Sequence, residues 1–308
     1  MLPFPPFALE RPDTLEDLVQ INQEPRTRLL AGGTDLLPSL KHRLFEPRTL
    51  VSLARVPLMK AVHEEDGGIT LGAGLTLRQV RETPLVRSRY PALAQACSTV
   101  ATPTIQEAAT LGGNVMLDTR CLYYNQPAGW REAIGGCLKA NGDVCHVART
   151  GSGCLAAHSA DTVPSLWLLG ARLRLHSTRG TREVPISDIF LDDGRNWLDL
   201  RPGEVLTAIH LPDPAGSITV HRKLRARAAI DYPLLLTAIQ LGTDRARAVV
   251  SAVGPRPILV ECDNPEELPD RAWKTAQPLN THAWSTTWRK HMVRVEVRRA
   301  LREALSQP

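Results

Sequence analysis

Residues 114–161 form the part of this 308-residue chain that most restricts how it can fold. Glycine, asparagine and proline are scattered through the segment, and neither strand nor helix periodicity lasts for long within it. An unstructured stretch of that length is uncommon in a compact domain unless it has a function or its own support. We therefore expect something other than a hydrophobic core to hold this segment in place.

Four of the six cysteines, Cys121, Cys137, Cys145 and Cys154, fall inside that segment, spaced C-x15-C-x7-C-x8-C. Without a secretion signal, such a cluster predicts a metal or redox centre rather than a disulfide framework. Four thiolates suit zinc or an iron–sulfur cluster. Neither the short C-x-x-C pairs typical of zinc sites nor the common ferredoxin run is present, so the spacing leaves the metal open. His146 is an alternative fourth ligand.

The remaining composition is that of an ordinary globular protein, with 43% apolar and 22% charged residues. No apolar run approaches the ~20 residues that span a bilayer. The N-terminus lacks the basic and apolar regions of a secretory signal. We expect a cytoplasmic protein without a membrane partner, in which Cys97 and Cys262 are ordinary buried thiols.

Much of the net charge of +5 lies after Arg271. A basic terminal helix can bind nucleic acid or an anionic partner. Few aromatic residues interleave with these charges and no nucleic-acid motif is present. A solvated helix face, with no nucleic-acid partner, is therefore the expectation.

Strand and helix signals alternate along the chain outside the cysteine segment. Strands are predicted at residues 28–31, 48–53, 69–73, 172–176, 204–211, 218–224 and 246–253. Helices are predicted at residues 36–43, 77–85, 92–100, 265–275 and 288–304. Pro212 and Pro214 mark the best boundary. The pattern predicts an α+β core followed by a smaller C-terminal α/β domain.

Two loops rich in small residues share one chemistry. The first reads AGGTD at 31–35 and the second TLGGN at 110–114. Glycines let backbone N–H groups approach a phosphate, and a following helix N-terminus favours negative charge. Two such loops can hold the two phosphates of one pyrophosphate, although plain turns explain each loop equally well. Neither matches a Rossmann or Walker fingerprint.

These two loops, followed by SAD at 159–161, resemble the FAD-binding (medium) subunit of the molybdenum hydroxylase family. That family includes xanthine dehydrogenase and carbon monoxide dehydrogenase. The resemblance implies the PCMH-like FAD-binding fold over residues 1–213, in two subdomains of about 1–55 and 56–213. It further implies a cysteine-rich insertion at about 115–157 and, at 214–308, the C-terminal domain typical of these flavin subunits.

The same resemblance implies a set of FAD contacts and no catalytic residue in this chain. The first loop would wrap the pyrophosphate, the second would complete the clamp, and later positions would hold the ribose or adenine and the ring. The implied contacts are Leu30, Ala31, Gly32, Gly33, Thr34, Asp35, Leu36, Val100, Ala101, Thr110, Gly113, Asn114, Asp161, Leu206 and Lys223. One departure is Gln106, which stands where members often have arginine.

The enlarged cysteine segment resembles the beta subunit of 4-hydroxybenzoyl-CoA reductase within that family. By this likeness the four clustered cysteines ligate a [4Fe–4S] cluster. Electrons would pass from a ferredoxin-like donor through cluster and FAD to a small [2Fe–2S] subunit and a large molybdenum-cofactor subunit. The assembly would be a dimer of heterotrimers.

Two other interpretations of the sequence stay open. The chain can be the FAD subunit of an NAD-linked xanthine dehydrogenase-like hydroxylase, although hydride transfer to NAD needs no extra cluster. It can also be a non-enzymatic protein with structural zinc and a basic docking tail, in which case the paired glycine loops are coincidental.

Overall fold

The computed structural model describes residues 3–151, 153–227 and 230–307. Its N-terminal part is a three-stranded parallel sheet in the order β1 (Ala8–Glu10), β3 (Thr49–Ser52), β2 (Thr27–Leu30). Helices α1 (Leu15–Ile21) and α2 (Leu36–Lys41) connect these strands. The Thr14 hydroxyl accepts a hydrogen bond from the Asp17 N–H and so caps α1.

A five-stranded antiparallel sheet forms the main core. Its order is β4 (Val62–Glu65), β5 (Gly68–Gly72), β8 (Val205–Leu211), β6 (Arg172–Ser177), β7 (Gly180–Pro185). Neighbouring strands β5 and β8 pair Ile69 with Leu211, so the chain leaves this sheet and returns to it much later.

Short helices and turns cover this core or connect its strands. They are η1 (Pro57–Lys60), α3 (Leu77–Glu82), α4 (Pro84–Arg89), α5 (Pro91–Ser98), α6 (Pro103–Gln106), α7 (Leu111–Val115), α9 (Val163–Leu168) and η2 (Ile186–Asp188).

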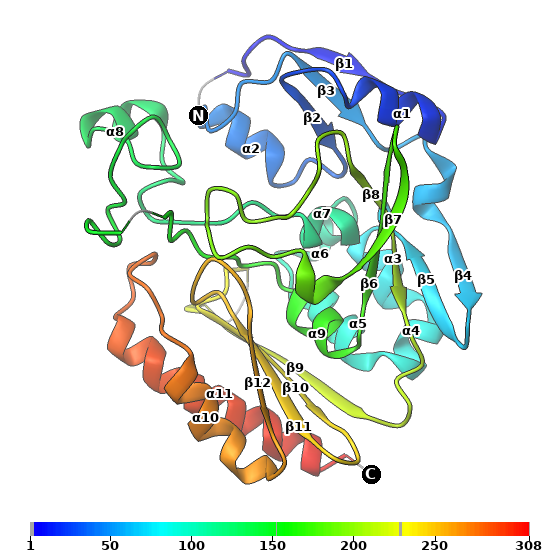
Figure 1. The fold of residues 1–308 in the computed structure, drawn as a ribbon, viewed down its shortest axis with the longest axis vertical. Helices are drawn as coiled ribbons and strands as arrows, with labels where there is room; N and C mark the ends of the chain where they lie inside the picture. The colour runs from blue at the N-terminus through cyan, green and yellow to red at the C-terminus, as the bar shows by residue number, and fades with distance from the viewer. Residues whose placement is uncertain (1–2, 152, 228–229, 308) are drawn as a thin grey trace.

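The C-terminal part is a four-stranded antiparallel sheet with helices on one face (Figure 1). Its order is β12 (Ile258–Cys262), β11 (Ala246–Ser251), β10 (Leu235–Leu241), β9 (Ile218–Leu224). After η3 (Pro265–Glu267), helices α10 (Leu268–Thr275) and α11 (Thr286–Leu305) cover it. On the other face, Leu168 of α9 packs against Ala238 and Val249, which joins this sheet to the main core.

The cysteine segment projects from the body between α7 and α9, beside α2 (Figure 1). It contains helix α8 (Ala128–Ala133), which the sequence pattern did not predict. The buried guanidinium of Arg131 donates to the carbonyl oxygens of His42 (3.0 Å) and Arg43 (2.7 Å). These bonds fasten the segment to the end of α2, a support that hydrophobic periodicity does not reveal.

The fold is α+β, as the sequence predicts. The short edge strands β1, β4 and β12 and the buried strand β10 were not predicted, because edge strands are brief and β10 is buried on both faces and lacks a clear alternation. Within the described residues, no helix combines the length and apolar character needed to cross a membrane.

Candidate functional site

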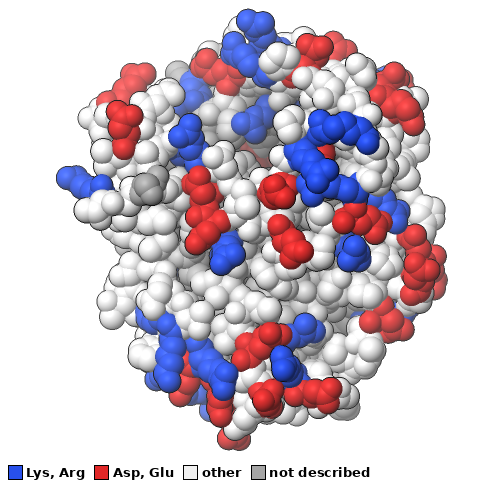
Figure 2. Space-filling model, in the orientation of Figure 1, with Lys and Arg blue, Asp and Glu red and all other residues white. Residues whose placement is uncertain are grey.

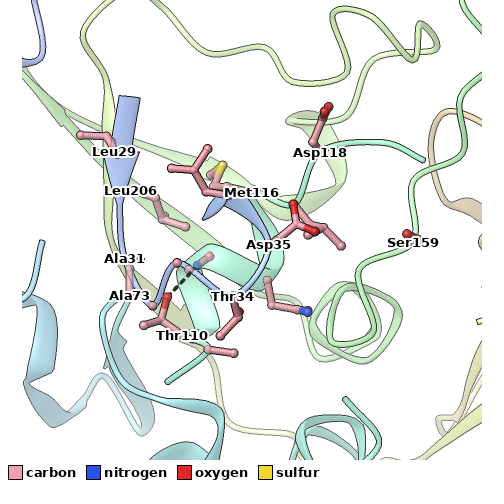
Figure 3. Close-up of a pocket in the computed structure, with 18 of the residues that line it drawn as sticks. Leu29, Ala31, Thr34, Asp35, Ala73, Thr110, Met116, Asp118, Ser159 and Leu206 are labelled. Atoms are coloured by element: carbon pink, nitrogen blue, oxygen red, sulfur yellow. Dashed lines mark hydrogen bonds between the residues drawn. The ribbon is translucent and has the colours of Figure 1, made fainter. Parts of the chain in front are cut away.

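A cavity of about 750 Å³ lies where the N-terminal sheet, the main core and the C-terminal sheet meet. Both glycine loops line it, together with Leu206 of β8 and Lys223 of β9. Figure 3 shows how Thr34 and Asp35 of one loop and Thr110 of the other face the same space. Its size lies within the roughly 300–1,000 Å³ typical of small-molecule sites.

The first loop carries the chain from β2 into α2 and depends on its glycines. A Cβ on Gly32 would lie 1.8 Å from the Ala108 carbonyl oxygen, so only glycine permits this close approach of the loop to the segment before the second loop. Gly33 has a φ of +71°, which glycine adopts without strain. Among the described residues, no backbone carbonyl accepts from the amides of residues 32–36. These amides are therefore available to an anion.

The second loop forms the start of α7. The Thr110 hydroxyl accepts from the Gly113 N–H at 3.0 Å and caps the helix. Asn114 Oδ1 accepts from both the backbone N–H of Thr162 (3.0 Å) and its hydroxyl (2.7 Å). This buried amide therefore ties the second loop to the SAD segment, and brings all three sequence motifs to one cavity.

A buried ion pair joins the SAD segment to the C-terminal sheet. Lys223 Nζ lies 2.6 Å from Asp161 Oδ1 and donates to the Thr99 carbonyl oxygen at 3.0 Å. Burial raises the pKa of Asp161 to about 6, although Lys223 opposes the rise. Nearby, the buried Ser159 hydroxyl has no hydrogen-bond partner within the described part of the chain. That hydroxyl can serve a bound molecule.

Cationic and aromatic side chains border the cavity. Arg120 forms an ion pair with Asp35, and its guanidinium lies 4.0 Å from the ring centre of Tyr232. Burial raises the pKa of Asp35, and Arg120 opposes that rise. Arg28 and Arg195 line the cavity as well, together with acidic residues such as Asp118 and Glu204, and Figure 2 shows both basic and acidic side chains around the hollow in the upper part of the molecule. The border therefore carries mixed charge.

Every contact residue expected from the resemblance lines this cavity except Leu30. Leu30 lies between two lining residues, Leu29 and Ala31, but does not itself line the cavity. Ala101 lines it with a φ of +43°, an uncommon conformation for a residue other than glycine.

Several lining residues escaped the sequence analysis, because they lie outside the motifs. They are Arg28, Ala73, Met116, Asp118, Arg120, Trp197 and Tyr232. Gln106, at the position of the missing arginine, donates to the carbonyl oxygens of Ser98 (3.0 Å) and Val100 (2.7 Å). It therefore supports the backbone of the cavity wall.

Residues 5–214 match the family model described as the FAD binding domain in molybdopterin dehydrogenase. The chain belongs to that family. The large cavity is accordingly the candidate FAD site of this chain. The free amides of the first loop and the unpartnered Ser159 hydroxyl fit an anionic dinucleotide of this kind.

Curated relatives extend over most of the chain. The FAD-binding subunit of an aldehyde oxidoreductase from Escherichia coli is 29% identical over 83% of this chain and 84% of its own length. A putative xanthine dehydrogenase FAD-binding subunit from the same species is 26% identical, covering 97% and 96%. The carbon monoxide dehydrogenase medium chain of Afipia carboxidovorans is 26% identical, covering 80% and 73%.

Solved structures agree with the fold. A chain of reconstituted CO dehydrogenase from Oligotropha carboxidovorans superposes with a TM-score of 0.78, at 21% identity over 100% of both chains. One of quinoline 2-oxidoreductase from Pseudomonas putida gives 0.77, at 22% identity over 98% of both.

A second, smaller pocket collects all four cysteines of the projecting segment: Cys121, Cys137, Cys145 and Cys154. All four are buried, and none is in a disulfide. Burial raises the pKa of the Cys121 thiol to about 11 and also raises that of Cys154. A buried thiol keeps its proton at neutral pH unless a metal binds, because metal binding requires the thiolate and releases the proton.

The four cysteines share this pocket without forming a site for one metal ion. No three His, Cys, Asp or Glu side chains of the described residues form a group that fits a single metal ion. Around one zinc ion, tetrahedral thiolates lie only about 3.8 Å apart. His146 borders the same pocket, and its Nε2 lies 2.7 Å from the Gly136 carbonyl oxygen. Cys97 and Cys262 lie elsewhere, in α5 and β12, and are buried as expected.

Proposed function

We propose that this chain is the electron-transfer subunit of a molybdenum-dependent reductase of the 4-hydroxybenzoyl-CoA reductase type. In this proposal the large cavity holds FAD and Cys121, Cys137, Cys145 and Cys154 hold a [4Fe–4S] cluster beside it. Bound FAD supplies the exchange between two-electron and one-electron transfer. The observation that carries the proposal is the convergence of four buried cysteines on one pocket, next to the cavity of an FAD-binding family.

The residues of the chain would divide the work of holding FAD. The free amides of residues 32–36 would bind the pyrophosphate, and Thr110, Gly113 and Asn114 would complete the clamp. Asp161 would hold the ribose or adenine end. The flavin ring would be shielded from water by Leu206, Val100 and Ala101. Lys223 would lie near this ring.

The burial of the four cysteines supports a cluster on physical grounds. All four thiols line one pocket, and a multi-iron group would separate its thiolates more widely than a single ion does. The low-dielectric surroundings would tune such a cluster, together with hydrogen bonds to its sulfurs. Backbone contacts already fix two ligands: Cys121 N–H donates to Asn125 Oδ1 (2.9 Å), and Cys154 N–H donates to Asp193 Oδ1 (3.1 Å).

The partners follow from the proposed activity. We propose assembly with a large molybdenum-cofactor subunit and a small [2Fe–2S] subunit, as a dimer of heterotrimers, with a ferredoxin-like protein as electron donor. The names of the relatives support an assembly, because two are FAD-binding subunits and one is a medium chain.

The test is an anaerobic visible spectrum of the purified protein, with iron and zinc counted on the same sample. We expect flavin bands and about four irons per chain. Cys137→Ser should lose most of the iron and keep the flavin, whereas Cys262→Ser, a buried cysteine outside the pocket, should keep both. Flavin without iron, in protein kept from oxygen throughout, would overturn the cluster assignment.

A further inference from the structure

Lys139 lies between the cysteine pocket and the FAD cavity. We call the layer of side chains formed by Lys139, Asp118, Tyr124 and Trp197 the wall between the two sites. Lys139 follows Cys137 by two residues and lines the cysteine pocket. Its side chain is only 5% exposed. Lysine is rarely buried this deeply unless its ammonium group is paired. Its positive charge acts strongly on its surroundings, because the protein interior screens charge less than water does.

The opposite side of this wall belongs to the FAD cavity. Lys139 Nζ lies 2.6 Å from Asp118 Oδ1 and 4.7 Å from the ring centre of Trp197, and both partners line that cavity. Tyr124, which lines the cysteine pocket, donates from its hydroxyl to Asp118 Oδ2 at 3.1 Å. One layer of side chains therefore separates the two sites, and Lys139 touches both of its faces.

A rigid loop holds this layer in place. Lys139 Nζ also donates to the Gly194 carbonyl oxygen (2.7 Å) and to the Thr119 hydroxyl. The Gly194 N–H in turn donates to the Cys154 carbonyl oxygen at 2.7 Å, and a Cβ on Gly194 would lie 2.6 Å from the Ala156 backbone. The same loop continues into Trp197, so one short segment links a cysteine to the FAD cavity.

The charge of Lys139 acts on both sites. On one side, Lys139 lines the same pocket as Cys137 and Cys154. On the other side, burial raises the pKa of Asp35 in the first glycine loop, while Arg120 and, more weakly, Lys139 oppose that rise. A cation between the two sites also favours an added electron on either side.

We propose that Lys139 and Asp118 together set the reduction potentials of the two redox centres, with Lys139 raising both potentials and Asp118 lowering them. This inference rests on the proposed function. Reduction adds one negative charge to a centre, so a fixed cation in the intervening wall stabilises the reduced form and a fixed anion destabilises it. Because the two residues form one pair, their removal shifts the potentials in opposite directions.

The test is a redox titration of the purified holoenzyme, followed by electron paramagnetic resonance for the cluster and by visible absorption for the flavin. Lys139→Met should lower the potential of the cluster by at least a tenfold change in its one-electron equilibrium, about 59 mV. The flavin potential should fall as well. Asp118→Asn should raise both, and Lys139→Arg, which keeps the charge, should leave them near the wild-type values.

Lys290→Met provides the matched control. Lys290 donates to the Ala276 carbonyl oxygen at the end of α10, in the helical layer of the C-terminal sheet. Its replacement should move neither potential. Opposite shifts of the potentials in Lys139→Met and Asp118→Asn indicate an electrostatic role. A loss of packing gives no reason for the two shifts to differ in sign.

The outcomes separate this inference from the proposed function. Unchanged potentials in Lys139→Met, or shifts of the same sign in Lys139→Met and Asp118→Asn, would overturn the inference while the cluster assignment stands. A wild-type enzyme without iron in this chain would overturn the proposed function. The flavin titration then still decides whether Lys139 acts on the FAD site. If Lys139→Met does not fold, Asp118→Asn alone must raise the potentials.

Discussion

The ion pair between Lys223 and Asp161 gives a stability prediction that can be worked out from the structure. The two side chains are 2% and 7% exposed, and Nζ lies 2.6 Å from Oδ1. Removing one partner of a buried pair typically costs about 3–5 kcal/mol, because the other charge stays buried without compensation. We therefore expect Lys223→Met to lower the free energy of unfolding by that amount at pH 7.5.

The pH dependence of this loss is the sharper part of the prediction. Burial already raises the pKa of Asp161 to about 6 beside Lys223. Without Lys223 that pKa rises further, so Asp161 becomes neutral as the pH falls and its burial becomes less unfavourable. Between that raised pKa and about pH 6, where Asp161 of the wild type becomes protonated as well, the loss caused by Lys223→Met should shrink by about 1.4 kcal/mol per pH unit as the pH falls.

Guanidinium unfolding of the FAD-free chain at pH 7.5 and 5.5 measures both effects, because other titrating groups cancel between wild type and variant. The double variant Asp161→Asn with Lys223→Met should recover most of the loss, since it leaves no uncompensated charge. The exposed pair of Arg271 and Glu267 is the control, and Arg271→Met should cost less than about 1 kcal/mol. A loss below about 1 kcal/mol for Lys223→Met, or one independent of pH, would refute the reasoning.

Two further predictions concern the glycine loop and the buried histidines. Gly32→Ala should displace the first loop from the Ala108 carbonyl and remove most of the FAD from purified protein, whereas Gly129→Ala in α8, where a Cβ meets no atom within 4 Å, should keep it. Flavin released on denaturation, counted per chain, checks this, and full occupancy in Gly32→Ala would contradict it. Burial lowers the pKa of His158 and of His221 to about 3, so below pH 6.5 the unfolded chain binds protons that the folded chain does not. Each histidine should therefore lower stability by about 1.4 kcal/mol per pH unit as the pH falls from 6 to 4. The free energy of unfolding of His158→Phe should therefore increase relative to that of the wild type by this amount per pH unit as the pH falls. If the two free energies change in parallel with pH, the prediction is wrong.

The motifs around the FAD cavity could be predicted from the sequence because the same few residues shape the backbone and line the cavity. A glycine that must approach Ala108 closely, and a threonine that must cap α7, leave short and recognisable patterns. That Leu30 does not line the cavity becomes visible only in the folded chain, because the motif itself does not distinguish it from its neighbours.

The wall between the two sites was not predictable from the sequence. Asp118, Lys139 and Trp197 come from separate segments, and each alone resembles an ordinary surface residue. Only the folded chain brings them together. The contact of Arg131 with the end of α2 is equally hidden in the sequence, because its acceptors are backbone carbonyl oxygens, which every residue has. The spacing of the cysteines indicated a shared site, but the pocket around them depends on this same assembly.

The return of the chain from β5 to β8 has a consequence for the order of events during synthesis. Strand β5, which contains Ile69, pairs early with β4 but lacks its second neighbour until Leu211 has left the ribosome, and the projecting segment emerges in the interval. Lys223, which completes the cavity wall, follows on β9. The lining of the candidate FAD cavity is therefore complete only after β9 has been synthesised. Retention of flavin reports that the first and last sheets of the molecule have docked.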